Sequence, residues 1–168
     1  MTILFLDEDP YLAARWLADN DIKQALRTSI QILTNAYYET NEDETKLLPA
    51  SEKYKLFQFY SIDHDCDEWA SETLANWSWV VFYGMSLCID YNLRFREVYP
   101  KVLLFRWFFD NPPSLPIKNQ TEFPIGYFAI IDHNLSAVQQ YRNYYMKKEN
   151  LKWELGIPKP SWYRTKGE

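Results

Sequence analysis

One apolar pattern constrains the fold of this chain more than any other. Between about Asp65 and Phe95, large apolar side chains recur mostly every three or four residues, at Trp69, Leu74, Trp77, Val81, Gly84, Leu87, Cys88, Tyr91 and Phe95. This spacing matches the period of an α-helix, so it predicts a central helix that runs almost unbroken through the stretch. Gly84 has a poor helix propensity, and its place in the pattern indicates a close helix crossing or a bend.

Shorter patterns on either side predict the remaining elements. Residues 2–6 are an apolar and β-branched run that predicts a short strand, and Asp9-Pro10 is typical of a helix that begins at Pro10. An apolar stripe predicts a second helix over about residues 21–38. We also expect a short helix over 101–109, an irregular connection over 110–134 with four prolines, and a helix from Asn134 or Ser136 to about Lys148.

The predicted fold class is therefore mainly α: a single-domain helical bundle over residues 1–168, with a short N-terminal strand and a long Pro-rich connection. A chain of this length can bury one continuous core without disulfides or a structural metal. Its longest apolar stretch, Trp77 to Ile89, is well short of the roughly 20 residues that span a bilayer, so we expect no membrane partner. The N-terminus lacks the features of a secretory leader, which predicts a cytoplasmic protein.

The cysteines and histidines provide little material for a metal site. Cys66 and Cys88, if both lie on one helix, are separated by roughly 33 Å at about 1.5 Å of rise per residue, which is beyond disulfide reach. With His64 and His133 they form none of the usual zinc-ligand spacings. Glycine-rich phosphate loops are also lacking. We therefore expect no metal, no cofactor and no hydrolysis of nucleoside triphosphates.

Charge restricts how this chain can contact nucleic acid. The net charge of −5 opposes broad attraction to phosphates, so any such contact must be local. Basic and aromatic residues do interleave near the C-terminus, at Tyr141, Arg142, Tyr144, Tyr145, Lys147, Lys148, Lys152, Trp153, Lys159, Trp162, Tyr163, Arg164 and Lys166. This basic and aromatic strip is suited to stacking bases. The alternative is that its cations solvate a helix whose aromatic side chains pack inward.

Polar residues in and near the predicted helices are candidates for a site. His64 lies among acids at the entrance to the central helix, where it could act as a general base with a raised pKa. Carboxylates at that place also favour the helix N-terminus without any function. Asn76 and Arg94 would need partners if they are buried, so structural hydrogen bonds are the alternative to a binding role. Asp19 could equally be a surface or capping residue.

A series of short motifs spans nearly the whole chain: Asp9-Pro10, Leu12-Ala13-Ala14, Asp19, Gln31, Asp63-His64-Asp65, Trp69, Asn76-Trp77-Ser78-Trp79, Asp90 to Arg94, Phe123-Pro124, Tyr141 to Tyr145 and Trp162-Tyr163. This series resembles a family of small uncharacterised proteins of T4-type tailed phages. The family carries a His-Cys-Asp-Lys-His run where this chain has Leu-Ala-Asp-Asn-Asp at residues 17–21, and a Lys and a Glu where it has Gln24 and Thr28. If that run is the family's active centre, the resemblance implies that only Asp19 and His64 remain of it here.

A second set of features lies at the start, the centre and the end of the chain: Met1-Thr2, an early Leu-Ala helix, the aromatic central helix and Trp162-Tyr163-Arg164. These features resemble the small helical pyrimidine-dimer glycosylases of the endonuclease V type. Such enzymes attack the sugar with the amine of the second residue, once the initiator methionine is removed, and flip a base out of the duplex. The resemblance implies that Thr2 would supply this amine, but Lys23 stands where an assisting Glu is expected.

These observations predict a phage accessory protein of glycosylase-like architecture that engages DNA or nucleotides and has a degenerate active site. The expected site residues are two catalytic candidates, Asp19 and His64, and six substrate-binding candidates: Asn76, Arg94, Arg142, Tyr145, Trp162 and Tyr163. The alternative is a noncatalytic protein-binding module, such as a host-factor inhibitor or a phage assembly component. Its support is the surplus of Trp and Tyr, which suits a protein interface.

Overall fold

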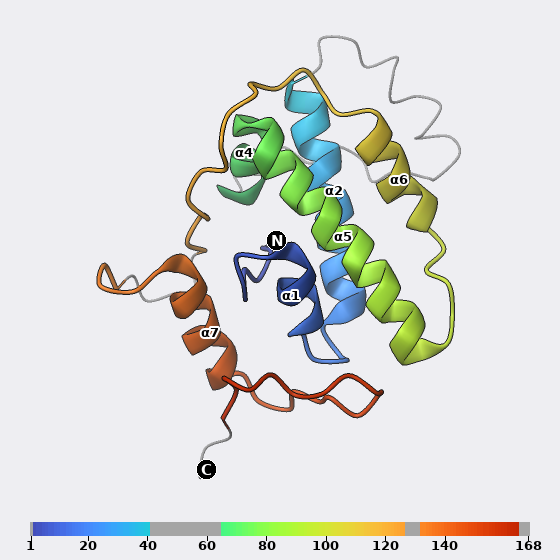
Figure 1. The fold of residues 1–168 in the computed structure, drawn as a ribbon, viewed down its shortest axis with the longest axis vertical. Coiled ribbons are helices and arrows are strands. Elements are labelled where there is room, and N and C mark those ends of the chain that lie inside the picture. The colour runs from blue at the N-terminus through green and yellow to red at the C-terminus, as the bar shows by residue number, and fades with distance from the viewer. Residues whose placement is uncertain (1, 41–64, 127–131, 165–168) are drawn as a thin grey trace.

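The computed structural model describes residues 2–40, 65–126 and 132–164. These residues form six α-helices: α1 (Pro10–Arg15), α2 (Ile22–Thr40), α4 (Asp65–Glu72), α5 (Leu74–Phe95), α6 (Val102–Asp110) and α7 (Ala137–Lys147). Figure 1 shows α5 crossing the molecule diagonally, with α7 set to one side. The predicted mainly α fold is confirmed. Among the described residues, no helix combines the length and the apolar character needed to cross a bilayer.

Helix α5 is the centre of the fold, and α1, α2, α4 and α6 all pack against it. The predicted continuous helix from Asp65 was wrong at one residue, because Thr73 has an extended backbone and separates α4 from α5. The Thr73 side chain accepts a hydrogen bond from the Asn76 N–H and so caps α5. A threonine within an apolar pattern is therefore a helix start here, which the spacing of the apolar residues alone does not indicate.

Gly84 marks a close crossing of α5 and α6. A Cβ atom at Gly84 would lie 1.9 Å from Cε1 of Phe105, and the Phe105 side chain is fully buried. The ring therefore occupies the space that any larger side chain at this position would need. Of the two expectations for Gly84, the close helix crossing is confirmed.

Residues 2–6 form neither helix nor strand, and the described residues contain no strand, so the expected N-terminal strand is not confirmed. The segment is held instead by its side chains. Phe5 is fully buried, and its ring centroid lies 4.4 Å from that of Phe123, 5.2 Å from that of Trp69 and 5.0 Å from that of Trp79. An apolar run that enters an aromatic core has the same composition as a buried strand, which explains the expectation.

Caps define the helix starts that the sequence predicts. Asp9 accepts a hydrogen bond from the Tyr11 N–H at 2.7 Å, and Pro10 is the first residue of α1. Ser136 caps α7 through a capping box with Gln139, in which each side chain accepts a hydrogen bond from the other residue's backbone. Both predicted starts, at Pro10 and after Ser136, are confirmed.

Candidate functional site

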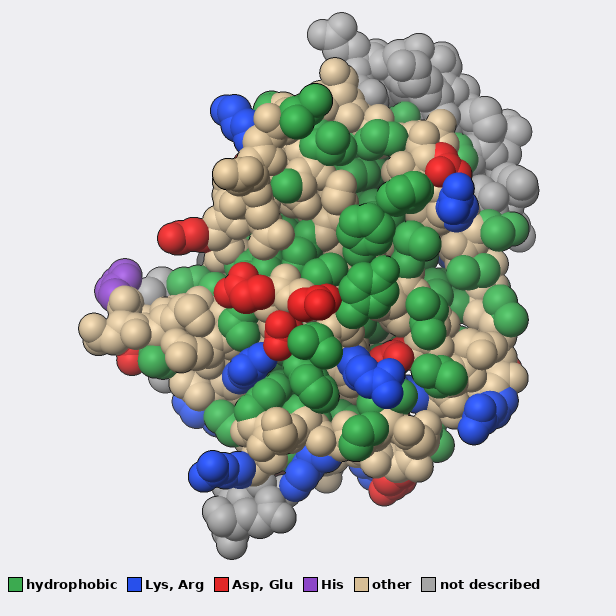
Figure 2. Space-filling view, viewed as in Figure 1, with side chains coloured by type: hydrophobic (Ala, Val, Ile, Leu, Met, Phe, Trp, Pro, Cys, Tyr) green, Lys and Arg blue, Asp and Glu red, His purple; other side chains and the backbone are tan. Residues whose placement is uncertain are grey.

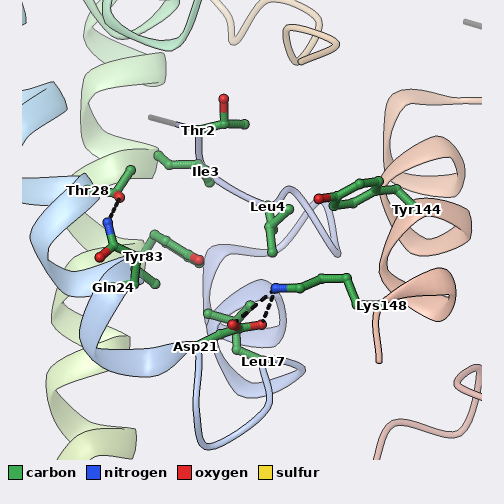
Figure 3. Close-up of a pocket in the computed structure, with 11 residues that line it drawn as sticks. Thr2, Ile3, Leu4, Leu17, Asp21, Gln24, Thr28, Tyr83, Tyr144 and Lys148 are labelled. Atoms are coloured by element: carbon green, nitrogen blue, oxygen red, sulfur yellow. Dashed lines mark hydrogen bonds and ion pairs between the residues drawn. The ribbon is translucent and has the colours of Figure 1, made fainter. Parts of the chain in front are cut away.

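A pocket opens beside residues 2–4, between the first turns of α2 and the C-terminal end of α7 (Figure 3). Its volume is about 180 Å³. Eleven residues from five segments of the chain line it: Thr2, Ile3, Leu4, Leu17, Asp21, Gln24, Ala25, Thr28, Tyr83, Tyr144 and Lys148. A concave site with mixed apolar walls and a few convergent polar groups is typical of small-molecule binding.

Among four of the lining residues, two come from the connection between α1 and α2, and two come from the first turns of α2. Leu17, Asp21, Gln24 and Thr28 are separated by four, three and four residues, and Gln24 Nε2 donates to Thr28 Oγ1 at 3.4 Å. At these positions the resembling phage family carries its two His residues, its second Lys and its Glu. Four of the seven positions that the resemblance singles out thus line one pocket, and none of these four keeps the family residue, whereas Ala18, Asp19 and Asn20 do not line it.

An ion pair lines the pocket, and a buried hydroxyl outside the lining holds this pair in place. Lys148 Nζ lies 2.9 and 3.1 Å from the two carboxylate oxygens of Asp21. Tyr145 Oη donates to Asp21 at 2.8 Å and accepts from the Ala18 N–H at 2.8 Å, so Tyr145 fixes the position of this carboxylate. Burial raises the pKa of Tyr145, and the hydroxyl keeps its proton. The opposite charges of Asp21 and Lys148 cancel, so this part of the pocket is polar but carries no net charge.

Tyr83 supplies a polar group that the protein does not use. The side chain belongs to α5, is 1% exposed and stacks on Trp79 with ring centroids 5.2 Å apart. Its hydroxyl has no hydrogen-bond partner within the described parts of the chain. Burial, and secondarily the Asp21 carboxylate, raise the pKa of this hydroxyl above its ordinary value, so it remains a donor. A buried hydroxyl without a partner is costly, and its place in a pocket lining points to a ligand atom as the missing partner.

Asp19 and Arg94, two of the expected site residues, meet in a buried ion pair, and neither residue lines the pocket. Arg94 Nη1 lies 2.8 Å from Asp19 Oδ1, and its side chain is fully buried. The same guanidinium donates to the carbonyls of Leu17 and Arg15, at 2.8 and 3.1 Å. The second Asp19 oxygen accepts from the Glu154 N–H at 2.7 Å. This network ties α5 to the turn before α2 and to the C-terminal segment, although Arg94 Nε has no hydrogen-bond partner among the described residues.

Asn76 lies in a different part of the molecule, at the junction of α4 and α5. It is fully buried, and its amide donates to the Trp69 carbonyl and to Thr121 Oγ1, each at 2.7 Å. Its oxygen accepts from the Thr121 N–H at 3.0 Å. The side chain therefore pins the connection after α6 to the helix junction. The observed contacts of Asn76 and Arg94 are thus structural hydrogen bonds within the protein, the alternative to a binding role.

The remaining binding candidates make contacts that hold the C-terminal region in place. Arg142 donates to the Leu6 carbonyl and pairs with Asp7, both at 2.7 Å, and its guanidinium lies 5.1 Å from the Trp162 ring. Tyr163 is 8% exposed and packs on Trp153, with ring centroids 4.7 Å apart. Many of the aromatic side chains of the strip therefore pack inward against the protein.

The basic part of the strip remains open to solvent. Its exposed cations are Lys147, Lys152, Lys159 and Arg164. Figure 2 shows Lys and Arg side chains on the lower half of one face, over α7 and the C-terminal segment, and a group of carboxylates nearer the middle. A local basic surface, which also holds the exposed carboxylates of Glu149 and Glu154, thus lies next to the segment that supplies Tyr144 and Lys148 to the pocket.

His64 lies outside the described residues, so its expected role stays a prediction. Within the described ranges, no group of three or more His, Cys, Asp or Glu side chains is placed to hold a metal ion. Cys66 and Cys88 are free and buried, and burial raises the pKa of each thiol to about 12. Both cysteines are therefore neutral, unreactive core residues at physiological pH.

Another hollow, of about 380 Å³, lies between α5 and α6 and does not include Tyr83. Its walls are mostly aliphatic, with Ile89 57%, Val98 69% and Leu103 57% exposed. Figure 2 shows hydrophobic side chains along the edge where α5 and α6 lie. We call this surface the α5–α6 hollow.

Sequence reasoning missed Tyr83 altogether and gave Tyr144 and Lys148 no place in a pocket. Tyr83 is one of several aromatic residues on an apolar helix, and nothing in the sequence distinguishes it from a core side chain. The signal that could have found the pocket is the replacement of family residues, because the replaced positions 17, 21, 24 and 28 line it, although the replaced positions 18 and 20 do not. Comparison with known proteins adds nothing to this, since no family model, no curated protein and no solved structure matches the chain.

Proposed function

We propose that this chain engages DNA or nucleotides through the pocket beside residues 2–4, as a phage accessory protein of glycosylase-like architecture. In this proposal it acts in the cytoplasm of the infected host cell, as the family resemblance implies. The observation that carries the proposal is that Leu17, Asp21, Gln24 and Thr28 line one pocket. At these positions the resembling family carries two His residues, a Lys and a Glu, whereas its Cys and Asp correspond to Ala18 and Asp19, which do not line the pocket.

The lining supports binding more than catalysis. The carboxylate of Asp21 is held by Lys148 and Tyr145, so its oxygens are already engaged in contacts within the protein. Lys23, at the position of the assisting Glu, lies over the Phe95 ring at 5.1 Å from its centroid and does not line the pocket. Thr2 does line it, so an amine on Thr2 would stand at the rim if Met1 were removed. We therefore propose a site that still binds its ligand but has lost the catalytic groups of the resembling families.

The exposed cations near α7 support contact with a phosphate backbone. Each phosphate that a cation neutralises on single-stranded DNA contributes a slope of about −0.7 to the dependence of log affinity on log salt. Lys147 and Lys152 are exposed and flank the end of α7, beside the pocket residue Lys148. Bases would then enter the pocket while the backbone follows the basic surface.

The test is the affinity for fluorescent single-stranded, duplex and abasic DNA across a salt series. We expect saturable, salt-sensitive binding, and the Lys147→Ala/Lys152→Ala variant should flatten the salt slope by about 1.4, or about 0.7 for each lost contact. Lys118→Ala, which removes an exposed lysine from the connection after α6, is the matched control and should leave the slope unchanged. Absence of binding at low salt would overturn the proposal.

Borohydride trapping on the abasic probe tests the degenerate site in the same experiment. We expect no covalent adduct, because Lys148 is paired with Asp21, and an amine on Thr2 would lack the assisting carboxylate, whose position Lys23 occupies. A trapped adduct would instead establish lyase chemistry, and peptide mapping would identify the amine.

A second candidate, the protein-binding module, is favoured by the α5–α6 hollow. Its exposed aliphatic side chains suit an amphipathic segment of a partner protein. Lys101 adjoins the hollow, and its pKa is lowered, mainly by burial and secondarily by the nearby charge of Arg27. Two neighbouring cations at the end of an apolar surface are complementary to a segment with an acidic end.

Leu93→Glu separates the two candidates. Leu93 lines the hollow and is 41% exposed. Under the first candidate this variant binds DNA like the wild-type chain. If DNA does not bind, the second candidate predicts a host or phage protein that the wild-type chain retains in a pulldown and Leu93→Glu releases.

A further inference from the structure

The charge of the pocket restricts the ligand group that can enter it. Asp21 and Lys148 are paired at 2.9 Å, and their side chains are only 20% and 31% exposed. A phosphate would compete with Asp21 for Lys148, and a cation would compete with Lys148 for Asp21. Either replacement leaves a partly buried charge without its partner, which is unfavourable. An uncharged polar group enters without breaking the pair.

The volume and walls restrict the group further. The volume of about 180 Å³ is enough for one heterocyclic base. Tyr144 stands at one wall and the aliphatic chains of Leu4 and Leu17 line the pocket (Figure 3). An aromatic ring beside apolar side chains is a surface on which a base can stack.

The Tyr83 hydroxyl requires a hydrogen-bond acceptor on the base. It lines the pocket, has no partner within the described residues, and keeps its proton because burial raises its pKa. A buried donor is satisfied by an acceptor such as a ring carbonyl oxygen. A base whose edge lacks a carbonyl leaves the donor unsatisfied, and sites built around such a hydrogen bond discriminate strongly against analogues that lack it.

We propose that the pocket takes a single uncharged nucleobase and that Tyr83 Oη donates a hydrogen bond to a ring carbonyl of that base. This rests on the proposed function, because it names the chemical group of the DNA or nucleotide that enters. Two sources carry this chemistry: an unstacked base of a DNA strand and a free nucleoside.

The test compares thymidine, thymidine 5′-monophosphate and deoxyadenosine, which lacks a ring carbonyl, by calorimetric titration of the full chain, alongside a thymidine oligonucleotide. We expect thymidine to bind at least about tenfold more tightly than deoxyadenosine, and the phosphate to add no affinity. Tyr83→Phe should weaken thymidine binding at least about tenfold without lowering the Tm, because the hydroxyl it removes has no partner in the unliganded protein.

Tyr141→Phe is the matched control. Tyr141 is also fully buried, but its hydroxyl donates to the Pro124 carbonyl at 2.8 Å and accepts from the Gly126 N–H at 3.1 Å. This variant should therefore lower the Tm and leave thymidine binding unchanged. The same substitution thus has opposite effects at two buried tyrosines, which a general weakening of the core would not produce.

The outcomes separate the two sources and the two proposals. Tyr83-dependent binding of the oligonucleotide but not of thymidine identifies a base of a DNA strand, whereas Tyr83-dependent binding of thymidine identifies the free nucleoside. DNA binding that Tyr83→Phe leaves unchanged overturns this inference and leaves the proposed function standing. Tighter binding of the phosphate, or equal binding of deoxyadenosine, also overturns it. If neither DNA nor nucleosides bind, the proposed function itself fails.

Discussion

Replacing Asp19 by alanine should lower the free energy of unfolding by about 3 kcal/mol, because Arg94 then remains buried without its closest counter-ion. The Arg94 side chain is 0% exposed and lies 2.8 Å from Asp19, with Asp90 as a more distant partner at 3.5 Å. The change also removes the acceptor for the Glu154 and Leu155 N–H groups. Urea unfolding followed by far-UV circular dichroism measures the effect.

The exposed pair Arg106–Asp110 is the control for this prediction. Its nitrogen and oxygen are 2.7 Å apart, closer than those of Arg94 and Asp19, but its side chains are 63% and 46% exposed. Asp110→Ala should therefore change the free energy of unfolding by less than about 0.5 kcal/mol. Similar small effects in both variants would contradict the view that solvent exclusion makes the Asp19 pair structural.

Replacing Gly84 by alanine should destabilise the fold by about 2 kcal/mol, although alanine is the better helix former by about 1 kcal/mol. The new methyl group would lie 1.9, 2.4 and 2.6 Å from three atoms of the Phe105 ring, so α5 and α6 must separate or the ring must move. For a domain of this size the loss corresponds to a fall in Tm of about 4 to 8 °C, measurable by calorimetry.

A double-mutant cycle shows whether the Phe105 ring is the cause. Phe105→Leu alone should destabilise the core, because the side chain it shortens is fully buried. In the Phe105→Leu background, Gly84→Ala should cost at least about 1 kcal/mol less than in the wild-type background. Strict additivity of the two substitutions would mean that the steric conflict lies elsewhere.

Local signals explain why the sequence predicted most of the helices. Asp9-Pro10 and Ser136-x-x-Gln139 are capping patterns, and the hydrogen bonds that satisfy them involve residues only a few positions apart. The break at Thr73 escaped prediction because the apolar spacing continues across it. The conformation of residues 2–6 depends on contacts with Phe123, which is more than a hundred positions away. Local sequence patterns carry no information about such contacts.

The candidate site was less predictable because it depends on which polar residues pair with each other. Asp19, Arg94 and Asn76 are conspicuous in the sequence, and the structure accounts for them as buried partners of backbone groups and of each other. Tyr83 is inconspicuous, yet its hydroxyl lacks a partner among the described residues. An unsatisfied group is a property of the packed structure, so composition and spacing could not reveal it.

The most direct test of the pocket as the ligand site is a nuclear magnetic resonance titration of the isotopically labelled chain with a thymidine oligonucleotide. We predict shift changes at the Gln24 side-chain amide, the Thr28 methyl group and the Tyr144 ring, which line the pocket. The Asn76 side-chain amide, held at the α4–α5 junction, should not shift. Changes confined to Ile89, Leu93 and Leu103 of the α5–α6 hollow, or no changes at all, would contradict the account.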